Sequence, residues 1–453
     1  MSRFSFIETA VKPERALLVG VERREDAWPV DRSLDELGRL AHTAGAEVVY
    51  RMSQRLERAV PKTLIGSGKV EELKAAVERL DVDVVIFDEE LTPAQQSNLE
   101  QALGEPVKVI DRTALILDIF GLHANTREGR LQVQLAQLQY LLPRLRGMWS
   151  HLAKEQTRGG IGSRFGQGES QLEVDRRLIR NQISVLRRRI EEIERRRTVQ
   201  AKERVASPAF RVALAGYTNA GKSTLLNRLT GAGVLSEDKL FATLDPTTRA
   251  YVLPGGRRMT VTDTVGFIQK LPHGLVEAFK STLSEVRDAD LILKVVDVHD
   301  EDWQLHLDAD DAVLSEIGAA DQSALTVFNK SDLLEEEDRR LLALRHPQAI
   351  VFSALTGEGS DHLVARLREE CERADETIAI EIPYAKGDLV SLVHRLGTVS
   401  NEEYGSDAVH LVARLPRRVA DYVRASCFQG EHEQADDDGL VDEVDEQAVP
   451  ADE

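Results

Sequence analysis

The 453-residue sequence has only two cysteines, Cys371 and Cys427, which lie far apart and have no histidine-rich surroundings. We therefore expect free thiols in a reducing compartment, with neither a disulfide framework nor a cysteine-ligated metal site. No window holds about 18 uninterrupted apolar residues, so no membrane span is predicted. The first ten residues, MSRFSFIETA, lack the apolar stretch of a secretion signal. These absences favour a cytoplasmic protein.

Positive charge is scarce overall, since 58 Lys and Arg face 77 Asp and Glu and the net charge is −19. The imbalance is uneven along the chain. Residues 431–453 contain eleven acidic residues and no Lys or Arg, whereas residues 127–204 contain eighteen Lys and Arg against nine Asp and Glu. We expect the tail to be disordered and solvated. The basic segment is a candidate for binding RNA.

The most informative stretch is RVALAGYTNAGKS at residues 211–223. Gly216, Gly221, Lys222 and Ser223 match the pattern G-x-x-x-x-G-K-[ST], between a predicted strand and a helical pattern. Glycines let the backbone wrap closely around phosphate oxygens, and N–H groups at the helix start point at the negative charge. Lys222 is expected to reach the outer phosphates and the Ser223 hydroxyl to bind Mg²⁺.

Three further segments follow in the order that a GTPase requires, each after a predicted strand. DTVG at 263–266 offers a carboxylate that holds Mg²⁺ through water and an N–H that contacts the γ-phosphate. NKSD at 329–332 offers a carboxylate that accepts two hydrogen bonds from guanine, a pair that adenine cannot supply. SAL at 353–355 is expected to back the base with a main-chain N–H.

Thr243 lies about twenty residues beyond Ser223, and its hydroxyl is the candidate for the second protein ligand of Mg²⁺. Thr247 and Thr248 are alternatives that spacing does not separate. The predicted Mg²⁺ ligands are thus Ser223, Thr243 and Asp263. The residues expected to contact GTP are Gly216, Tyr217, Thr218, Asn219, Ala220, Gly221, Lys222, Ser223, Phe241, Ala242, Thr243, Leu244, Asp245, Asp263, Thr264, Val265, Gly266, Asn329, Lys330, Ser331, Asp332, Ser353, Ala354 and Leu355.

The residue that orients the attacking water is not evident. Phe267 occupies the position where Ras-like enzymes have a glutamine, so intrinsic turnover is expected to be slow and stimulated by a partner. Gln269 is a candidate substitute, with a surface residue as the alternative. Asn219 suggests a K⁺ ion beside the phosphates, which would supply the charge of an arginine finger. Its alternative role is to tolerate a turn.

The region before the phosphate loop alternates strands and helices, which predicts a small α/β domain with a mostly parallel sheet. The predicted strands are 16–21, 46–51, 82–87 and 107–111, and the predicted helices are 34–43, 69–79 and 93–103. IGSGK at 65–69 fails as a second phosphate loop. Thr63 replaces its first glycine and Val70 its Mg²⁺ hydroxyl, so a turn before a helix is expected.

Two helical patterns follow, with apolar residues spaced by three and four at 131–145 and 179–193. Joined by a loop with five glycines at 157–170, they predict an antiparallel coiled-coil hairpin. The arginines at 187–189 and 195–197 are expected outside its seam, either as solvated faces with Glu partners or as phosphate contacts. In the loop, Arg158 and Arg164 are candidates for binding RNA. Phe165 either stacks on a base or caps the hairpin tip.

Several long segments resemble the HflX family of translation-factor-related GTPases. They are GYTNAGKST, LFATLDPTTR at 240–249, DTVGFI, NKSD, DRT at 111–113, and the stretches at 121–145 and 159–173, so the resemblance spans roughly residues 10–425. The loop at 162–170 departs from it with an extra residue and no proline. The resemblance places the Mg²⁺ threonine at Thr243. It implies binding to the large ribosomal subunit, a hairpin that reaches toward the peptidyl-transferase region, and rescue of stalled ribosomes by subunit separation under stress.

We therefore predict a monomeric, cytoplasmic α/β protein built around a P-loop GTPase domain. The expected regions are an N-terminal α/β domain at 1–125, a basic helical hairpin at 126–205, the GTPase domain at 206–373, a small α+β domain at 374–430 and a disordered acidic tail at 431–453. Its partners would be GTP and GDP, Mg²⁺, K⁺ if Asn219 binds it, and the large ribosomal subunit. The alternative function is a signalling switch that acts on a protein through the coiled coil.

Overall fold

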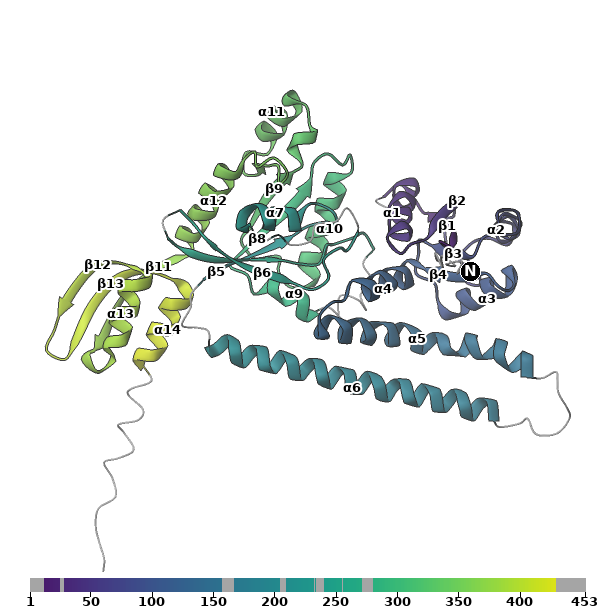
Figure 1. Cartoon of the computed structure of the whole chain (residues 1–453), viewed down its shortest axis with the longest axis horizontal. Helices are drawn as coiled ribbons and strands as arrows, with labels where there is room; N and C mark the ends of the chain where they lie inside the picture. The colour runs from purple at the N-terminus through teal and green to yellow at the C-terminus, as the bar shows by residue number, and fades with distance from the viewer. Residues whose placement is uncertain are drawn as a thin grey trace, which may run out of the picture. The chain divides into compact units, whose positions relative to one another are not determined.

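The structure is a computed structural model that describes residues 12–24, 28–156, 167–203, 209–231, 233, 240–254, 256–270 and 280–428 (Figure 1). The predicted RNA contacts Arg158, Arg164 and Phe165 and the acidic tail lie outside these residues. The chain divides into two compact units. One comprises residues 1–197, 211–252 and 259–363, and the other comprises 198–210, 253–258 and 364–453. The five predicted regions stay a prediction.

The N-terminal region is a three-layer α/β sandwich, which agrees with the predicted α/β domain with a parallel sheet. Its parallel sheet has the order β2-β1-β3-β4 and is formed by β1 (Arg15–Glu22), β2 (Glu47–Arg55), β3 (Val84–Phe87) and β4 (Lys108–Asp111). Alternate residues of β1 face opposite sides of the sheet. Ala16 and Leu18 pack with α1 (Val30–Thr43) and α4 (Arg112–His123). Leu17 and Val19 pack with α2 (Ser67–Leu80) and α3 (Pro93–Leu103).

Two local features explain how these helices begin. The IGSGK segment forms the turn into α2, where the Gly66 N–H donates to Gln54 Oε1 at 2.9 Å. Helix α4 was not predicted, because it follows β4 without an intervening turn sequence. Asp111 ends the strand and also caps the helix, and its carboxylate accepts from the Ala114 N–H at 2.9 Å.

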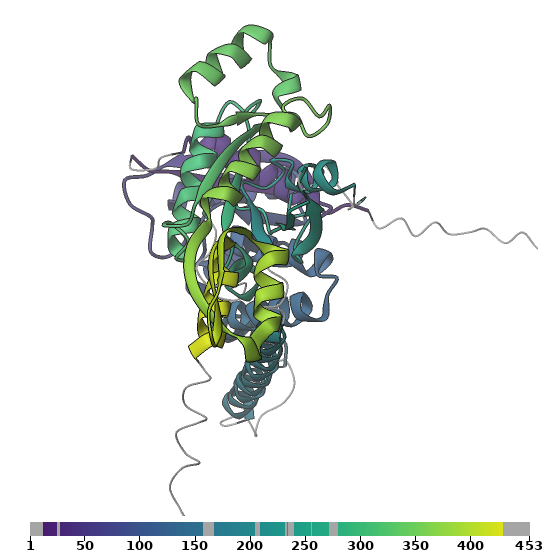
Figure 2. The ribbon, with the colours of Figure 1, turned by 90° about the vertical axis from the view of Figure 1, so that its left-hand side faces the viewer.

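The hairpin consists of α5 (Arg127–Gln156) and α6 (Gln167–Glu203), which run side by side in Figures 1 and 2. The predicted seam is confirmed. It contains Leu131, Leu135, Ile183, Leu186 and Ile190, with Leu138, Leu142, Ile179 and Ile193 packed against them. As expected, the arginines at 187–189, 195 and 196 are exposed outside the seam.

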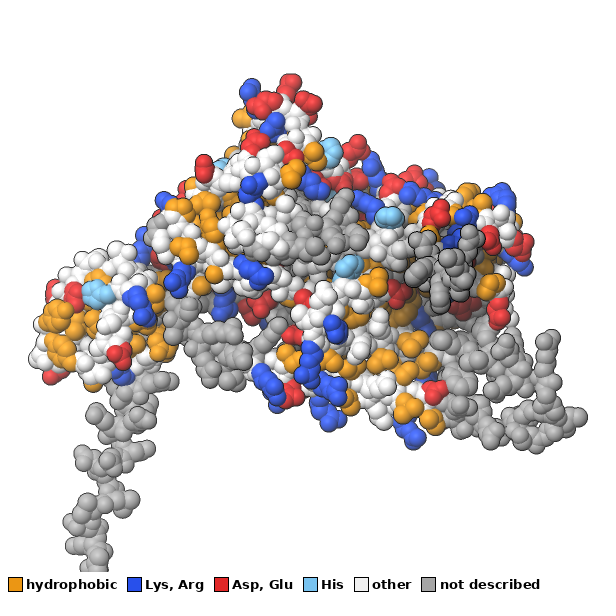
Figure 3. Space-filling model, viewed as in Figure 1, with side chains coloured by type: hydrophobic (Ala, Val, Ile, Leu, Met, Phe, Trp, Pro, Cys, Tyr) orange, Lys and Arg blue, Asp and Glu red, His pale blue; other side chains and the backbone are white. Residues whose placement is uncertain are grey.

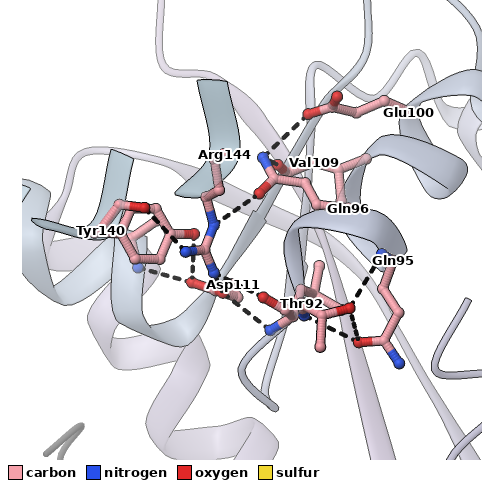
Figure 4. Close-up of polar contacts among 10 residues, drawn as sticks. Thr92, Gln95, Gln96, Glu100, Val109, Asp111, Tyr140 and Arg144 are labelled. Atoms are coloured by element: carbon pink, nitrogen blue, oxygen red, sulfur yellow. Dashed lines mark hydrogen bonds and ion pairs between the residues drawn. The ribbon is translucent and has the colours of Figure 1, made fainter. Parts of the chain in front are cut away.

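Helix α5 is anchored to the N-terminal sheet through one buried arginine (Figure 4). Arg144 donates to the Leu91 carbonyl at 2.7 Å, to Gln96 Oε1 at 3.1 Å and to Asp111 Oδ2 at 3.2 Å. Tyr140 donates its hydroxyl to the other Asp111 oxygen at 2.9 Å, and the Arg144 guanidinium stacks 3.5 Å from the Tyr140 ring centre. Because several charge-assisted bonds converge here, the middle of α5 is attached to the end of β4.

The GTPase region has a six-stranded sheet of order β10-β9-β8-β5-β7-β6. Its strands are β5 (Phe210–Ala215), β6 (Thr247–Val252), β7 (Arg258–Asp263), β8 (Leu291–Asp297), β9 (Ala324–Asn329) and β10 (Ile350–Val351). Its helices are α7 (Lys222–Thr230), α9 (Lys280–Arg287), α10 (Trp303–Glu316), α11 (Glu336–Arg345) and α12 (Ser360–Arg373). Strands β10, β9, β8 and β5 are parallel, so their carboxyl ends share one edge, where ligands bind in such sheets.

The second unit contains a small α+β module, in which α13 (Gly387–Leu396) and α14 (Arg417–Phe428) pack on one face of an antiparallel sheet (Figures 1 and 2). The sheet order is β11-β13-β12, with β11 (Asp375–Pro383), β12 (Thr398–Tyr404) and β13 (Ala408–Pro416). Strand β12 was not predicted, because its sequence TVSNEEY is polar and lies at the sheet edge. Among the residues that the structure describes, no helix is both long and apolar enough to cross a membrane.

Candidate functional site

The phosphate loop joins β5 to α7 and depends on two glycines. Gly216 has φ +146°, and a Cβ there would lie 2.2 Å from the Val295 carbonyl oxygen. Gly221 caps α7 with φ +91°, and a Cβ there would lie 2.2 Å from Asn329 Nδ2. Both positions therefore exclude any side chain. N–H groups at the start of a helix have no partner within the helix, so the start of α7 can bind negative charge, as the motif requires.

Lys222 lies buried beneath this loop. Its Nζ donates to the carbonyl oxygens of Gly216 and Tyr217, each at 2.8 Å. Burial lowers the pKa of Lys222, and the nearby Asp263 carboxylate opposes that shift. A Cβ at Gly266 would lie 2.7 Å from Thr218 Cα and 3.1 Å from Lys222 Nζ, so the loop after β7 contacts the phosphate loop directly.

The three predicted Mg²⁺ ligands converge. Ser223 Oγ lies 2.9 Å from Thr243 Oγ1 and donates to Asp263 Oδ2 at 2.6 Å, and Thr243 Oγ1 donates to the same carboxylate oxygen at 3.2 Å. The other oxygen, Asp263 Oδ1, is buried without a hydrogen-bond partner, and burial raises the pKa of Asp263. Hydroxyl and carboxylate oxygens suit Mg²⁺, and the unpartnered oxygen would gain a partner from the ion or its water. The residues present therefore fit the ion.

Ser223 and Thr243 also line a cleft. It is lined by Thr218, Asn219, Gly221, Lys222, Ser223, Thr224, Phe241, Ala242, Thr243, Thr264 and Gly266. Most of the predicted phosphate and metal residues are thus brought together, and Thr224 is an addition.

The predicted guanine loops lie next to each other. Asn329 donates to the Ala220 carbonyl at 2.8 Å and accepts from the Ala354 N–H at 2.9 Å, so it links the phosphate loop to the 353–355 segment. Asp332 accepts from Ser353 Oγ at 2.5 Å. The Ala354 N–H is used by Asn329, and the predicted contact of a main-chain N–H of this segment with the base stays a prediction.

Two contacts of this region had no signal in the sequence. Arg228 of α7 donates to the carbonyls of Ala354, at 3.1 Å, and of Leu355, which fixes the guanine loop to the helix after the phosphate loop. Lys330 has φ +63° and pairs with Asp297 at 2.7 Å. Arg228 carries no signal in the sequence, and although Lys330 belongs to the NKSD motif, only the fold identifies Asp297 as its partner.

Tyr217 and Gln269 face the N-terminal region instead of the cleft. The Tyr217 hydroxyl donates to Glu36 and accepts from the Gln269 N–H at 2.8 Å. The Gln269 side chain accepts from Ser33 Oγ at 3.1 Å and is buried, which contradicts the alternative of a surface residue. In this conformation Gln269 is not placed to orient water, and its catalytic role stays a prediction.

A buried charge cluster surrounds this contact. Arg112 of α4 pairs with Glu36 and, at 2.7 Å, with Asp88, and Asp88 also binds Lys270 Nζ at 2.6 Å. Arg112, Glu36 and Asp88 are each no more than 2% exposed. Because Lys270 closely follows the DTVG segment, the N-terminal region contacts the loop that is expected to sense the γ-phosphate.

The fold and this cleft define a P-loop GTPase, with a phosphate loop, an oxygen-lined Mg²⁺ position and a guanine loop at the carboxyl edge of a mainly parallel sheet. Family models match at residues 31–121 ("GTP-binding GTPase N-terminal"), 123–204 ("GTP-binding GTPase Middle Region") and 211–330 ("50S ribosome-binding GTPase").

Whole-chain relatives agree. A GTPase HflX of Magnetococcus marinus is 47% identical, covering 91% of this chain and 95% of the relative. That of Escherichia coli is 42% identical, covering 89% and 94%. The chain belongs to the HflX family of GTPases. A GTP-binding protein from Sulfolobus solfataricus, solved in complex with GDP, resembles it more weakly, with 23% identity, a TM-score of 0.40, and coverage of 79% of this chain and 98% of that one.

Proposed function

We propose that this GTPase binds the large ribosomal subunit through its hairpin, that GTP favours the bound state, and that the complex serves to separate the subunits of stalled ribosomes. The observation that carries the proposal is the row of exposed arginines along α6. Lys and Arg side chains gather over α6 in Figure 3. Such a row neutralises RNA phosphates with release of counterions. The description of the matching family model, a 50S ribosome-binding GTPase, supports the choice of partner.

In this proposal the chain's own residues hold and sense the nucleotide. Lys222 and the N–H groups of the phosphate loop bind the phosphates, and Ser223, Thr243 and Asp263 hold the Mg²⁺ ion, which supplies charge stabilisation for phosphoryl transfer. Asp332 selects guanine. Since Phe267 cannot orient water, intrinsic hydrolysis is slow and the ribosomal subunit accelerates it.

The test is co-sedimentation with purified large subunits in a non-hydrolysable GTP analogue or in GDP. We expect more binding with the analogue and a clear loss in the variant Arg187→Glu/Arg188→Glu. The matched control, Arg287→Glu/Arg340→Glu, changes the same charge on exposed helical sites of the GTPase region. The slope of log affinity against log salt should fall by roughly 0.7–0.9 for each phosphate that the hairpin no longer neutralises. If the hairpin variant and the control variant bind the large subunit equally well, an RNA role for the hairpin is contradicted and a protein partner is favoured.

Two finer points extend the proposal. The variant Arg158→Ala/Arg164→Ala should lower the stimulation of GTP turnover by large subunits, because a cationic, glycine-rich tip suits a narrow RNA-lined space. Whole ribosomes incubated with the protein and the GTP analogue should show a fall in light scattering as subunits separate. If binding occurs without that fall, the protein is a ribosome-bound GTPase with another role.

We also propose that K⁺ binds beside Asn219. Asn219 lines the same cleft as Lys222 and Ser223, and its φ is +64°. Turnover in KCl should exceed turnover in NaCl at equal ionic strength, because a bound cation stabilises the developing negative charge. Equal rates would leave Asn219 with the turn role only.

A further inference from the structure

The segment that carries the predicted Mg²⁺ threonine is docked on the start of the hairpin. Asp245 accepts from the backbone N–H groups of Asn125 at 2.9 Å and Thr126 at 2.8 Å, both at the same oxygen, Oδ2. The Thr126 hydroxyl donates to the other oxygen, Oδ1. One carboxylate thus binds three donors that lie about 120 residues away in the chain.

These donors lie immediately before α5, which begins at Arg127. The Thr126 hydroxyl also accepts from the Gly129 N–H at 2.9 Å, so Thr126 caps the helix while Asp245 holds Thr126. The carboxylate lies at the N-terminal end of α5, where the helix dipole favours negative charge. A carboxylate in this position is therefore stabilised by both the hydrogen bonds and the helix dipole.

Gly129 provides the space for the carboxylate. A Cβ at Gly129 would lie only 2.3 Å from Asp245 Oδ1, so any other residue would displace it. In a helix interior glycine costs about 1 kcal/mol relative to alanine. The missing side chain at Gly129 makes room for Asp245.

The same segment enters the metal site two residues earlier. Thr243 Oγ1 is the atom that lies 2.9 Å from Ser223 Oγ and 3.2 Å from Asp263 Oδ2. Two residues of extended chain span at most about 7 Å. A movement of Thr243 away from the metal site by more than a few ångström therefore pulls on Asp245.

Apolar contacts fix the segment at two further points. Phe241 is 1% exposed and packs edge-on against Phe120 of α4, with ring centres 4.8 Å apart. Leu244 is 2% exposed and belongs to the same core cluster as α1 and α4. The segment 241–245 is therefore held on one side by α4 and α5 and offers Thr243 to the nucleotide cleft on the other.

We propose that Asp245 is a positioning residue that holds Thr243 at the Mg²⁺ site by docking on the first turn of α5, and that nucleotide exchange changes the packing of α5 through this contact. Coupling of this kind is reciprocal, so whatever stabilises the start of α5 also favours the nucleotide that needs Thr243. That nucleotide is the triphosphate, because Thr243 is the predicted ligand of Mg²⁺ in the triphosphate state. The inference concerns the GTPase itself and holds whether or not the ribosomal proposal is correct.

The test uses two independent variants of the full chain. Asp245→Asn keeps the size of the side chain and removes its charge, and Gly129→Ala leaves Asp245 intact and takes its space. Their matched controls are Asp361→Asn, at an exposed position of α12, and Gly121→Ala, where a Cβ meets only the Gln137 amide at 3.4 Å. Thermal unfolding first confirms that each variant is folded.

The first readout is nucleotide affinity as a function of Mg²⁺ concentration. Both variants lose hydrogen bonds to a charged group. We therefore expect the Mg²⁺ concentration that gives half-maximal binding of a non-hydrolysable GTP analogue to rise about tenfold in Asp245→Asn and in Gly129→Ala. GDP affinity should change less than about twofold. A merely structural defect would weaken both nucleotides alike, so an equal loss would overturn the proposal, as would wild-type behaviour of both variants.

The second readout does not depend on activity. Hydrogen exchange of peptides covering residues 125–130 should be slower in the GTP analogue than in GDP for the wild-type protein. This difference should vanish in Asp245→Asn and Gly129→Ala and persist in the two controls. Exchange that is indifferent to the nucleotide in the wild-type protein would refute the transmission to α5.

Discussion

Replacing Arg112 with methionine should destabilise the contact between the N-terminal region and the GTPase site. Arg112 is 2% exposed, and it pairs with Glu36 and Asp88, which are 1% and 2% exposed. Burial lowers the pKa of Arg112 to about 10, so the guanidinium is still charged at neutral pH. Methionine matches much of its volume but removes the cation that both buried carboxylates share.

The magnitude follows from the partners that remain. Asp88 retains Lys270 Nζ and Ser33 Oγ, both at 2.6 Å, whereas Glu36 retains the Tyr217 hydroxyl. Breaking a buried ion pair by removing one partner costs about 3–5 kcal/mol. We therefore expect Arg112→Met to lower the free energy of unfolding by about 3–5 kcal/mol. The double variant Arg112→Met/Glu36→Leu should recover much of it, because no unpaired charge is left at Glu36.

Arg51→Met is the matched control. Arg51 also pairs with an acidic residue of the same region, Asp35, but both side chains are about half exposed. Its loss should be at most about 1 kcal/mol. Because a chain with several regions need not unfold in one step, hydrogen exchange of α1 and α4 complements urea unfolding. A loss in Arg112→Met no larger than in Arg51→Met would refute the reasoning.

Three further predictions concern single sites. Gly221→Ala should abolish nucleotide binding in a calorimetric titration, because its Cβ would lie 2.2 Å from Asn329 Nδ2 and its φ is +91°; retained affinity would mean that the loop tolerates a side chain. Asp310 of α10 is 1% exposed, and burial raises its pKa from the ordinary 3.8 to about 8. Because the pKa of Asp310 is higher in the folded than in the unfolded chain, the wild-type protein loses stability as the pH rises from about 4 to about 8. Asp310→Asn should therefore unfold at a higher temperature than the wild type at pH 8, and the difference between the two should be smaller at pH 5. A difference that does not depend on pH would contradict this. Thr92→Ala should lower the unfolding free energy by about 1 kcal/mol, since Thr92 and Gln95 form the capping box of α3; an unchanged urea midpoint would show that the cap contributes nothing.

The sequence predicted those parts of the fold that have a local signal. Alternating strands and helices, the heptad-like spacing of the hairpin and the order of the GTPase segments each depend on residues close together in the chain, and all appear in the structure. Helix α4 and strand β12 were missed because α4 follows a strand without a turn residue and β12 is a polar edge strand. Local pattern carries no information about either case.

The contacts between the N-terminal region and the GTPase region could not be predicted from the sequence, for a different reason. Tyr217 was expected at the nucleotide because it lies in the phosphate loop, yet its side chain packs 4.0 Å from the His306 ring and binds Glu36. The partners Tyr217 and Glu36 are 181 residues apart. No periodicity links such residues, and each is an ordinary polar side chain in its own segment. One signal was present, because a conformationally costly glycine such as Gly129 in a helix start indicates a close neighbour.

The anchoring of Arg144 has a mechanical consequence. Beyond that residue about 18 Å of α5 projects toward Gln156, at 1.5 Å per residue. If α5 tilts about this anchor, one arm reaches back about 26 Å to Arg127 and the other ends at Gln156. A tilt of roughly 10° about this pivot would sweep the Gln156 end by about 3 Å. If nucleotide exchange moves the first turn of α5 as proposed, this geometry would carry that movement to the end of the helix where the proposed ribosomal contact begins.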